Sequence, residues 1–218
     1  MNNIFQETVN IPIDKITIIG DLSIPKYAKG LIVFAHGSGS SRHSPRNKHV
    51  AQILQRSGFA TLLFDLLTVE EDQDYETRFN IDLLTTRLIK VTDWLKSDIT
   101  RADLAVGYFG ASTGAAATLR AAATLGSEII RAVVSRGGRP DLAGQPFLAQ
   151  IKSPTMLIVG GLDELVIDMN EEALALITAE KEIRIIPGAS HLFEEPGKLE
   201  EVAMLAAEWF DKYLVTLT

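Results

Sequence analysis

Residues 104–125 have the sequence LAVGYFGASTGAAATLRAAATL, which predicts a strand, a sharp turn and a helix in succession. Its first part, Leu104–Phe109, is an apolar run of strand length, and its last part, Thr113–Leu125, is alanine-rich and has the length of a helix. Gly110 and Gly114 bracket Ser112, so the predicted strand passes into the predicted helix through a sharp turn. A continuous apolar run indicates a strand that is covered on both faces, as in a parallel sheet.

The same alternation of apolar runs and helical stretches continues on both sides of this segment. Further strands are predicted at Leu31–Ala35, Ala60–Phe64, Ala132–Ser135, Thr155–Val159 and Ile183–Ile186. Further helices are predicted at Arg46–Ser57, Asn80–Ser97, Met169–Ala179 and Lys198–Leu214. The pattern predicts an α/β fold with one open, mostly parallel sheet and helices on both of its faces.

The first thirty residues follow a different pattern. Apolar residues alternate with polar ones over Glu7–Ile13 and Ile16–Ile24, with a break at Asp14 and Lys15. This period of two predicts an N-terminal antiparallel hairpin. We find no linker that would separate two domains and no insertion long enough for a large lid, so residues 1–218 are predicted to form a single α/β domain.

Composition limits the partners. The chain has 21 Lys and Arg against 28 Asp and Glu, a net charge of −7, which argues against a nucleic-acid or anionic-membrane partner. Its apolar runs are far shorter than the roughly 20 residues that span a bilayer, and no signal peptide is visible, so a cytoplasmic protein is expected. The absence of cysteine excludes disulfides, thiolate metal sites and a cysteine nucleophile.

Ser112 is the candidate nucleophile. Gly110–Gly114 matches the pattern G-x-S-x-G, and it lies in the strand–turn–helix context that this pattern requires. Glycines on both sides relieve the crowding of a tight turn, which then presents the serine at the carboxyl end of the sheet. The amide of Thr113, at the start of the following helix, points toward the space where an oxyanion would form.

A serine nucleophile needs a base and an acid that orients the base. His191 follows the last predicted strand, which places it at the same sheet edge as Ser112. Asp163 follows the strand Thr155–Val159 and is the candidate acid. Glu164 and Asp168 are alternatives to Asp163, although Asp168 also fits as the cap of the next predicted helix.

The chain order Ser112, Asp163, His191 is that of the α/β-hydrolase fold. Together with the short segments that surround these residues, it resembles the dienelactone-hydrolase-like family from about Gly30 to the C-terminus; these segments are His36-Gly-Ser-Gly, Gly161-Leu-Asp163 and Pro187-Gly-Ala-Ser-His191. Dienelactone hydrolases proper use a cysteine nucleophile, which this chain lacks, so the resemblance favours a serine-dependent relative of the esterase type.

The resemblance also implies a second oxyanion donor. In similar hydrolases the residue after His-Gly donates its amide to the oxyanion, and here that residue is Ser38. An alternative for this segment is a dinucleotide-binding loop, because Gly37-Ser-Gly39 follows a strand and Asp65 ends the next one. The third glycine of that motif is replaced by Arg42, which counts against it.

Four arginines follow the predicted strands at this edge: Arg42, Arg46, Arg136 and Arg139. If they converge, they could bind a carboxylate or phosphate of the substrate, since guanidinium groups match both anions. The alternative is that the arginines are solvated or paired with the acidic side chains of residues 70–74. We expect this acidic segment to form a loop near the mouth of the site.

These features predict a serine hydrolase that cleaves an ester of a small molecule through an acyl-enzyme on Ser112, with no cofactor and no metal. Convergence of the arginines would indicate an anionic substrate. A hydrolase-fold acyltransferase or a non-catalytic binding protein is the alternative, and a thioesterase or peptidase ranks below both. An exposed sheet edge or the final helix could support a homodimer.

Overall fold

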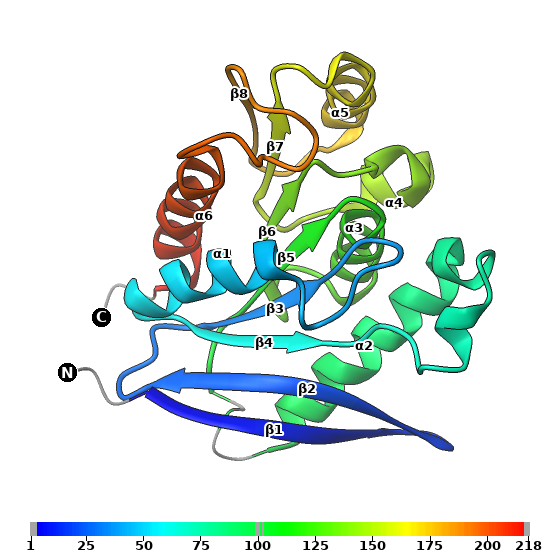
Figure 1. The fold of residues 1–218 in the computed structure, drawn as a ribbon, viewed down its shortest axis with the longest axis vertical. Helices are drawn as coiled ribbons and strands as arrows, with labels where there is room; N and C mark the ends of the chain where they lie inside the picture. The colour runs from blue at the N-terminus through cyan, green and yellow to red at the C-terminus, as the bar shows by residue number, and fades with distance from the viewer. Residues whose placement is uncertain (1–3, 99–100, 102, 216–218) are drawn as a thin grey trace.

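A computed structural model describes residues 4–98, 101 and 103–215. These residues form one eight-stranded sheet with the strand order β1-β2-β4-β3-β5-β6-β7-β8 (Figure 1). β1 (Ile4–Ile13) and β2 (Ile16–Pro25) form the predicted antiparallel hairpin, and β2 also pairs antiparallel with β4 (Ala60–Phe64). Every other pairing is parallel, so the predicted architecture is confirmed.

The parallel strands form the centre of the molecule. They are β3 (Leu31–Ala35), β5 (Val106–Ala111), β6 (Ile130–Arg136), β7 (Thr155–Gly160) and the edge strand β8 (Lys181–Ile186). All residues of β3, β4, β5 and β7 are buried, as their continuous apolar runs predict. β8 lies at the edge of the sheet and is largely exposed or half-buried.

Helices cover both faces of this sheet. α1 (Pro45–Arg56) and α6 (Lys198–Leu214) pack on one face with Ile32, Phe34 and Phe109 of the strands. α2 (Ile81–Ser97), α3 (Thr113–Leu125), α4 (Gln145–Gln150) and α5 (Glu164–Leu176) lie on the other face, as Figure 1 shows. Because the core is divided between the two faces of the sheet, the carboxyl ends of the parallel strands are left free to carry loops.

Local capping explains two of the helix starts. Ser44 precedes Pro45 and its hydroxyl accepts a hydrogen bond from the Asn47 amide at 3.3 Å. Asn80 likewise accepts from the Leu83 amide at 3.0 Å, and this sets the start of α2. Both helices therefore begin within one residue of their predicted positions.

The start of α5 was predicted incorrectly. The helix begins at Glu164 rather than Met169, and it ends at Leu176 rather than Ala179. Asp168 therefore lies inside the helix and cannot be its N-cap, and Asp163 occupies the N-cap position. β5 is shifted two residues from its predicted bounds, and α4 and the short 3₁₀ turns at Glu71–Gln73, Thr77–Phe79 and Pro140–Ala143 were not predicted.

The described residues show no further domain inserted between the strands. The longest connection at the carboxyl edge, residues 65–80 between β4 and α2, holds two of the 3₁₀ turns. Among the described residues, no helix combines the length and apolar character needed to cross a membrane. Residues 1–3, 99, 100, 102 and 216–218 of the predicted domain lie outside the described residues.

Candidate active site

Ser112 lies in the turn between β5 and α3, and its backbone has a conformation that residues other than glycine rarely adopt. Its φ is +51° and its ψ is −121°. The Ser112 amide donates to the carbonyl of Arg136 at 3.2 Å, and the Ser112 carbonyl accepts from the Arg139 amide at 3.1 Å. The turn is thus held by the segment that follows β6. A strained, half-buried serine at the carboxyl end of the sheet is what the sequence pattern predicts.

The two glycines of the turn are required by their neighbours. A Cβ on Gly110 would lie 2.5 Å from Cα of Ala115 in α3. A Cβ on Gly114 would lie 2.3 Å from the carbonyl oxygen of Ala35 and 2.4 Å from that of His36. The crowding therefore comes from α3 and from the end of β3, rather than from the turn alone. Glycine at these positions lets the helix approach the strands closely.

His191 and Asp163 form a direct hydrogen bond. His191 Nδ1 lies 2.6 Å from Oδ2 of Asp163, which leaves Nε2 free for another partner. The Asp163 side chain is 19% exposed and the His191 side chain 40% exposed. An aspartate at an N-cap position usually accepts from the helix amides, but Asp163 makes no such capping bond. Its carboxylate bonds the imidazole instead and fixes the ring tautomer.

The loop that carries His191 is hydrogen-bonded to the turn after β7. The Leu162 amide donates to the Ala189 carbonyl at 3.0 Å, and the Gly161 amide donates to the Ile186 carbonyl at 2.8 Å. A Cβ on Gly160 would lie 2.5 Å from two carbonyl oxygens of this loop, so glycine is needed for the close approach. These contacts bring the base and the acid together from two separate strand ends.

The nucleophile turn and the imidazole share one neighbouring segment. The backbone carbonyl of Arg136 accepts a hydrogen bond from the Ser112 amide. A Cβ on the next residue, Gly137, would lie 3.6 Å from Cε1 of His191. The loop after β3 also lies against Ser112, since a Cβ on Gly37 would lie 3.1 Å from Cβ of Ser112. Ser112, His191 and the glycine loop (residues 37–39) are therefore gathered at one edge of the sheet.

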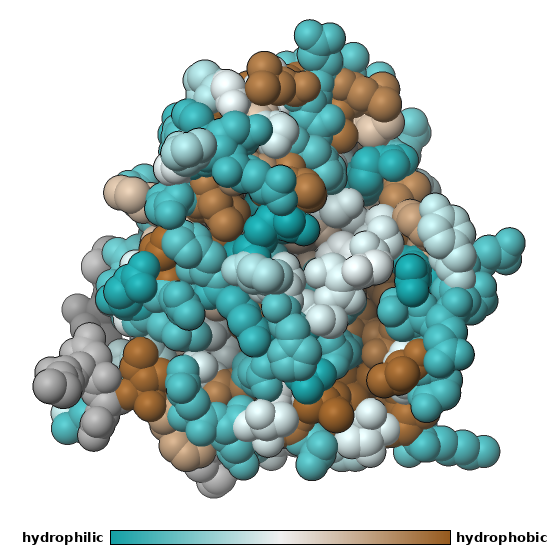
Figure 2. Space-filling model, in the orientation of Figure 1, coloured by the Kyte–Doolittle hydropathy of each residue, from teal (hydrophilic) through white to brown (hydrophobic). Residues whose placement is uncertain are grey.

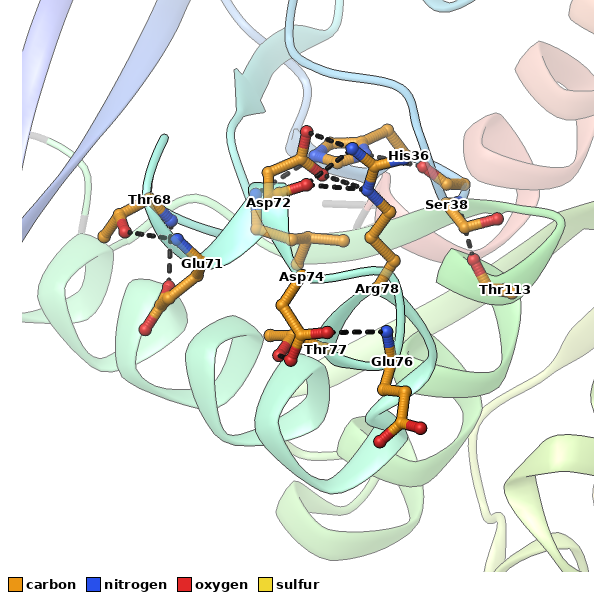
Figure 3. Close-up of polar contacts among 12 residues, drawn as sticks. His36, Ser38, Thr68, Glu71, Asp72, Asp74, Glu76, Thr77, Arg78 and Thr113 are labelled. Atoms are coloured by element: carbon orange, nitrogen blue, oxygen red, sulfur yellow. Dashed lines mark hydrogen bonds and ion pairs between the residues drawn. The ribbon is translucent and has the colours of Figure 1, made fainter.

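The amide of Ser38 donates a hydrogen bond to the side-chain hydroxyl of Thr113 at 2.8 Å (Figure 3). Thr113 is the first residue of α3, so its own amide has no carbonyl partner inside the helix. The two residues that we expected to form the oxyanion hole are thus in direct contact. The sequence could not show that one of them is already hydrogen-bonded by the other.

Three of the four predicted arginines are in ion pairs with carboxylates of this chain. Arg42 pairs with Asp65, Arg139 binds Asp141 through two nitrogens at 2.7 and 2.8 Å, and Arg46 lies 3.0 Å from Glu194. These partners differ from the residues 70–74 that we considered. That acidic segment instead supplies Asp72 to Arg78 and Glu71 to Arg87.

Arg136 is the exception among these arginines, because it is buried and its side chain bonds an amide. Its Nη2 donates to Oδ1 of Asn47 at 3.3 Å, and its guanidinium lies 6.0 Å from the centre of the Phe193 ring. Burial, with a smaller contribution from the charge of Arg46, lowers the pKa of Arg136 to about 10. The group still carries its positive charge at neutral pH.

Arg78 is a residue near the site that the sequence did not single out. Its Nε donates to the carbonyl of Asp72 at 2.8 Å, and a Cβ on Gly39 would lie 3.8 Å from its Nη1. Figure 3 shows the arginine beside His36 and Ser38, with the Asp72 side chain against it. No motif marks this arginine, because the contact depends on how the segment between β4 and α2 folds back over the glycine loop.

Buried His36 has a structural part in the loop after β3. Its Nε2 accepts the Leu66 amide at 3.1 Å, and its Nδ1 donates to the Gly37 carbonyl at 2.9 Å. These two bonds use the neutral ring, and burial lowers the pKa of His36 below its usual value. Among the described residues, no group of three or more His, Asp or Glu side chains is placed to hold a metal ion.

A pH effect on stability follows from His36. The unfolded chain takes up a proton on this residue near pH 6.5, whereas the folded chain does so only at lower pH. The free energy of unfolding should therefore fall as the pH drops below about 6.5. Urea unfolding between pH 7.5 and 5.5 should show a steeper loss in the wild type than in His36→Gln. The variant of exposed His43, His43→Gln, should follow the wild type, and parallel slopes in all three proteins would contradict this assignment.

Known proteins match this chain over nearly its whole length. A model described as the dienelactone hydrolase family matches residues 18–217. The crystal structure of a dienelactone hydrolase from Anabaena variabilis is 54% identical, with a TM-score of 0.93, over 97% of this chain and 99% of that one. Est1E from Butyrivibrio proteoclasticus has a TM-score of 0.80 at 18% identity, over 94% of this chain and 98% of that one, and this likeness shows the fold alone.

Two curated relatives carry a different kind of name. They are proteins of two Mycobacterium tuberculosis strains, each named "Putative phosphoribosyl transferase", and each is 53% identical to this chain over 208 residues. The match covers 95% of this chain but 46% of each relative. This chain therefore spans about half the length of those proteins, whose name describes a longer molecule.

Proposed function

This chain belongs to the dienelactone hydrolase family, and we propose that it is a serine hydrolase of small carboxylic esters that works through an acyl-enzyme on Ser112. The observation that carries the proposal is the 2.6 Å hydrogen bond between Asp163 and His191, at the same edge of the sheet as the strained turn of Ser112. A carboxylate, an imidazole and a serine in this chain order are the groups that acyl transfer needs.

The proposed reaction has two half-reactions. Ser112 Oγ attacks the ester carbonyl carbon while His191 Nε2 takes the serine proton, and the imidazolium that forms is stabilised by Asp163. The tetrahedral intermediate collapses to an acyl-enzyme, and the leaving alkoxide takes the proton from His191. A water molecule then repeats the attack, with His191 as its base, and releases the carboxylic acid and free Ser112.

We further propose that the preferred substrates are small and neutral. Arg42, Arg46 and Arg139 are occupied by carboxylates of this chain, and Arg136 is buried, so a substrate anion meets little free positive charge. Large apolar side chains are exposed beside the acid and the base, namely Leu162, Leu165 and Leu192. Apolar residues also gather at the β8 and α5 end of the surface in Figure 2. An apolar alkyl group of the ester would cover them.

Covalent labelling tests this proposal directly. Incubation with a fluorophosphonate should give one adduct, and peptide mapping should place it on Ser112. In parallel, p-nitrophenyl acetate, butyrate and octanoate should be hydrolysed, and the anionic hemisuccinate ester should have a kcat/KM at least about tenfold below that of the butyrate, a cost of about 1.4 kcal/mol. An adduct on another serine would refute the nucleophile, and an equal or higher rate for the anionic ester would refute the neutral preference.

The same samples separate the rival functions. An acyltransferase should give more ester or amide product than free acid when an alcohol or amine is added. A binding protein should neither react with the fluorophosphonate nor hydrolyse the esters. A thioesterase or a peptidase should cleave its thioester or peptide substrate faster than an oxygen ester. Phosphoribosyl transfer without ester cleavage would show that the name of the longer relatives describes this chain as well.

A further inference from the structure

The contact between Ser38 and Thr113 has a consequence for the oxyanion hole. An amide has one hydrogen, and the Ser38 amide gives its hydrogen to Oγ1 of Thr113 at 2.8 Å. While this bond is in place, Ser38 has no hydrogen left for a substrate oxygen. The resemblance that assigns the Ser38 amide to the oxyanion therefore conflicts with the hydrogen bonding that the structure shows.

The Thr113 hydroxyl carries the other hydrogen at this contact. Thr113 directly follows Ser112, is 3% exposed, and begins α3. Its oxygen accepts from Ser38, so its own hydrogen is available to donate. Among the described residues, no hydrogen bond uses that hydrogen. The amide of Thr113, at the positive end of the helix, also lacks a partner within the helix.

We propose that the hydroxyl of Thr113, rather than the amide of Ser38, gives the second hydrogen bond to the oxyanion. This inference rests on the proposed ester hydrolysis at Ser112. The amide and the hydroxyl of Thr113 then donate to one substrate oxygen, and the Ser38 amide keeps its hydrogen bond to the hydroxyl oxygen. A hydroxyl that accepts a hydrogen bond becomes a better donor, because bonds in a chain polarise one another.

The role of Thr113 requires no transfer of its proton. As negative charge develops on the carbonyl oxygen, the O–H and N–H of Thr113 shorten their contacts to it and keep their hydrogens. Both groups are fixed beforehand by α3 and by the glycine loop, so they need little reorganisation when the charge forms. The proton that moves is the one that His191 takes from Ser112.

Replacing Thr113 by valine tests the proposal, because valine keeps the shape and loses the hydroxyl. Thr113→Val should lower kcat for p-nitrophenyl butyrate about 10²- to 10³-fold, the usual effect of losing one oxyanion donor, with KM changed less than about threefold. Thr113→Ser keeps a hydroxyl and should retain at least about a tenth of the wild-type kcat. A kcat in Thr113→Val equal to or above that of the wild type would overturn the proposal.

A second measurement excludes a purely structural role. The rate constant for inactivation by diethyl p-nitrophenyl phosphate, which also places charge on an oxygen, should fall in parallel with kcat. Thr118→Val is the matched control, since it removes a buried hydroxyl of the same helix that donates to the Ala115 carbonyl. It should keep the wild-type kcat, and its thermal unfolding midpoint should move at least as far as that of Thr113→Val. Equal losses of kcat in the two variants would overturn the assignment.

The outcome for Thr113 can be read apart from the outcome for Ser112. If Ser112→Ala is inactive and Thr113→Val is fully active, the hydrolase proposal stands and the oxyanion assignment fails. If Ser112→Ala hydrolyses the ester at the wild-type rate, the hydrolase proposal itself fails, whatever Thr113→Val does.

Discussion

Replacing Ser112 by alanine is expected to lower kcat for p-nitrophenyl butyrate by on the order of 10⁴-fold or more, because the acyl-enzyme can no longer form. Rates with saturating ester, corrected for the rate without protein, measure this loss. Ser57→Ala is the matched control, since its hydroxyl bonds the Ile53 carbonyl at the end of α1 and lies away from the site. Less than a tenfold loss in Ser112→Ala would contradict the assigned nucleophile.

The backbone of Ser112 gives this substitution a second readout. With φ at +51° and ψ at −121°, the residue stores strain of about 1–3 kcal/mol, which alanine shares and glycine relieves. Ser112→Ala should therefore have nearly the wild-type free energy of unfolding. Ser112→Gly should be equally inactive but more stable than Ser112→Ala by about 1 kcal/mol, after the greater freedom of glycine in the unfolded chain is allowed for. Equal stability of the two variants would argue against strain at this turn.

The three proposed catalytic residues should also act as one unit. Once Ser112 is alanine, His191 has no nucleophile to activate, so adding His191→Gln should cost less than about tenfold further. The single variant His191→Gln should by itself lose on the order of 10⁴-fold. If the two losses multiply in the double variant, Ser112 and His191 act separately and the proposed mechanism is wrong.

The fold was predictable because hydrophobic pattern and topology agree over most of the chain. β3, β4, α3 and α6 have the bounds that the sequence indicates, since each is an apolar run or an amphipathic stripe with clear ends. The start of α5 was missed because Asp168 fits an N-cap and because Val166 and Ile167 before it are β-branched residues of lower helix propensity. In the structure the Asp163 carbonyl accepts a hydrogen bond from the Ile167 amide at 2.9 Å, so the helix already begins at Glu164.

The candidate site was predictable to the level of strand ends and no further. Parallel strands bring their carboxyl ends to one edge, so the order of Ser112, Asp163 and His191 placed them together. The partners of individual polar groups depend on loop geometry that no local pattern encodes. The pairing of Arg42 with Asp65 and the bond from Ser38 to Thr113 are of this kind. The arginines illustrate the limit, because no local pattern indicates that Arg42, Arg46 and Arg139 pair with carboxylates of this chain.

Replacing Gly114 by alanine is expected to be among the most destabilising single changes in this chain. The added Cβ would lie 2.3 and 2.4 Å from the carbonyl oxygens of Ala35 and His36, and both are backbone atoms at the buried end of β3. They cannot move away as a flexible side chain could, so either α3 or β3 must shift. Overpacking of this kind costs about 3 kcal/mol or more, and urea unfolding should show a correspondingly lower midpoint.

Gly126→Ala separates lack of space from lack of backbone freedom. Gly126 has φ +78° and ψ 168°, a backbone region that residues other than glycine rarely adopt, and no heavy atom lies within 4 Å of where a Cβ would be. The same change there therefore costs only backbone strain, about 1–3 kcal/mol. Gly114→Ala should therefore be the less stable of the two. A shift of α3 also displaces Ser112 and Thr113, so any folded Gly114→Ala should lose kcat, whereas Gly126→Ala should retain it. The opposite order of stability would show that α3 can retreat from β3, and that the glycine after the nucleophile is not what holds the helix against the sheet.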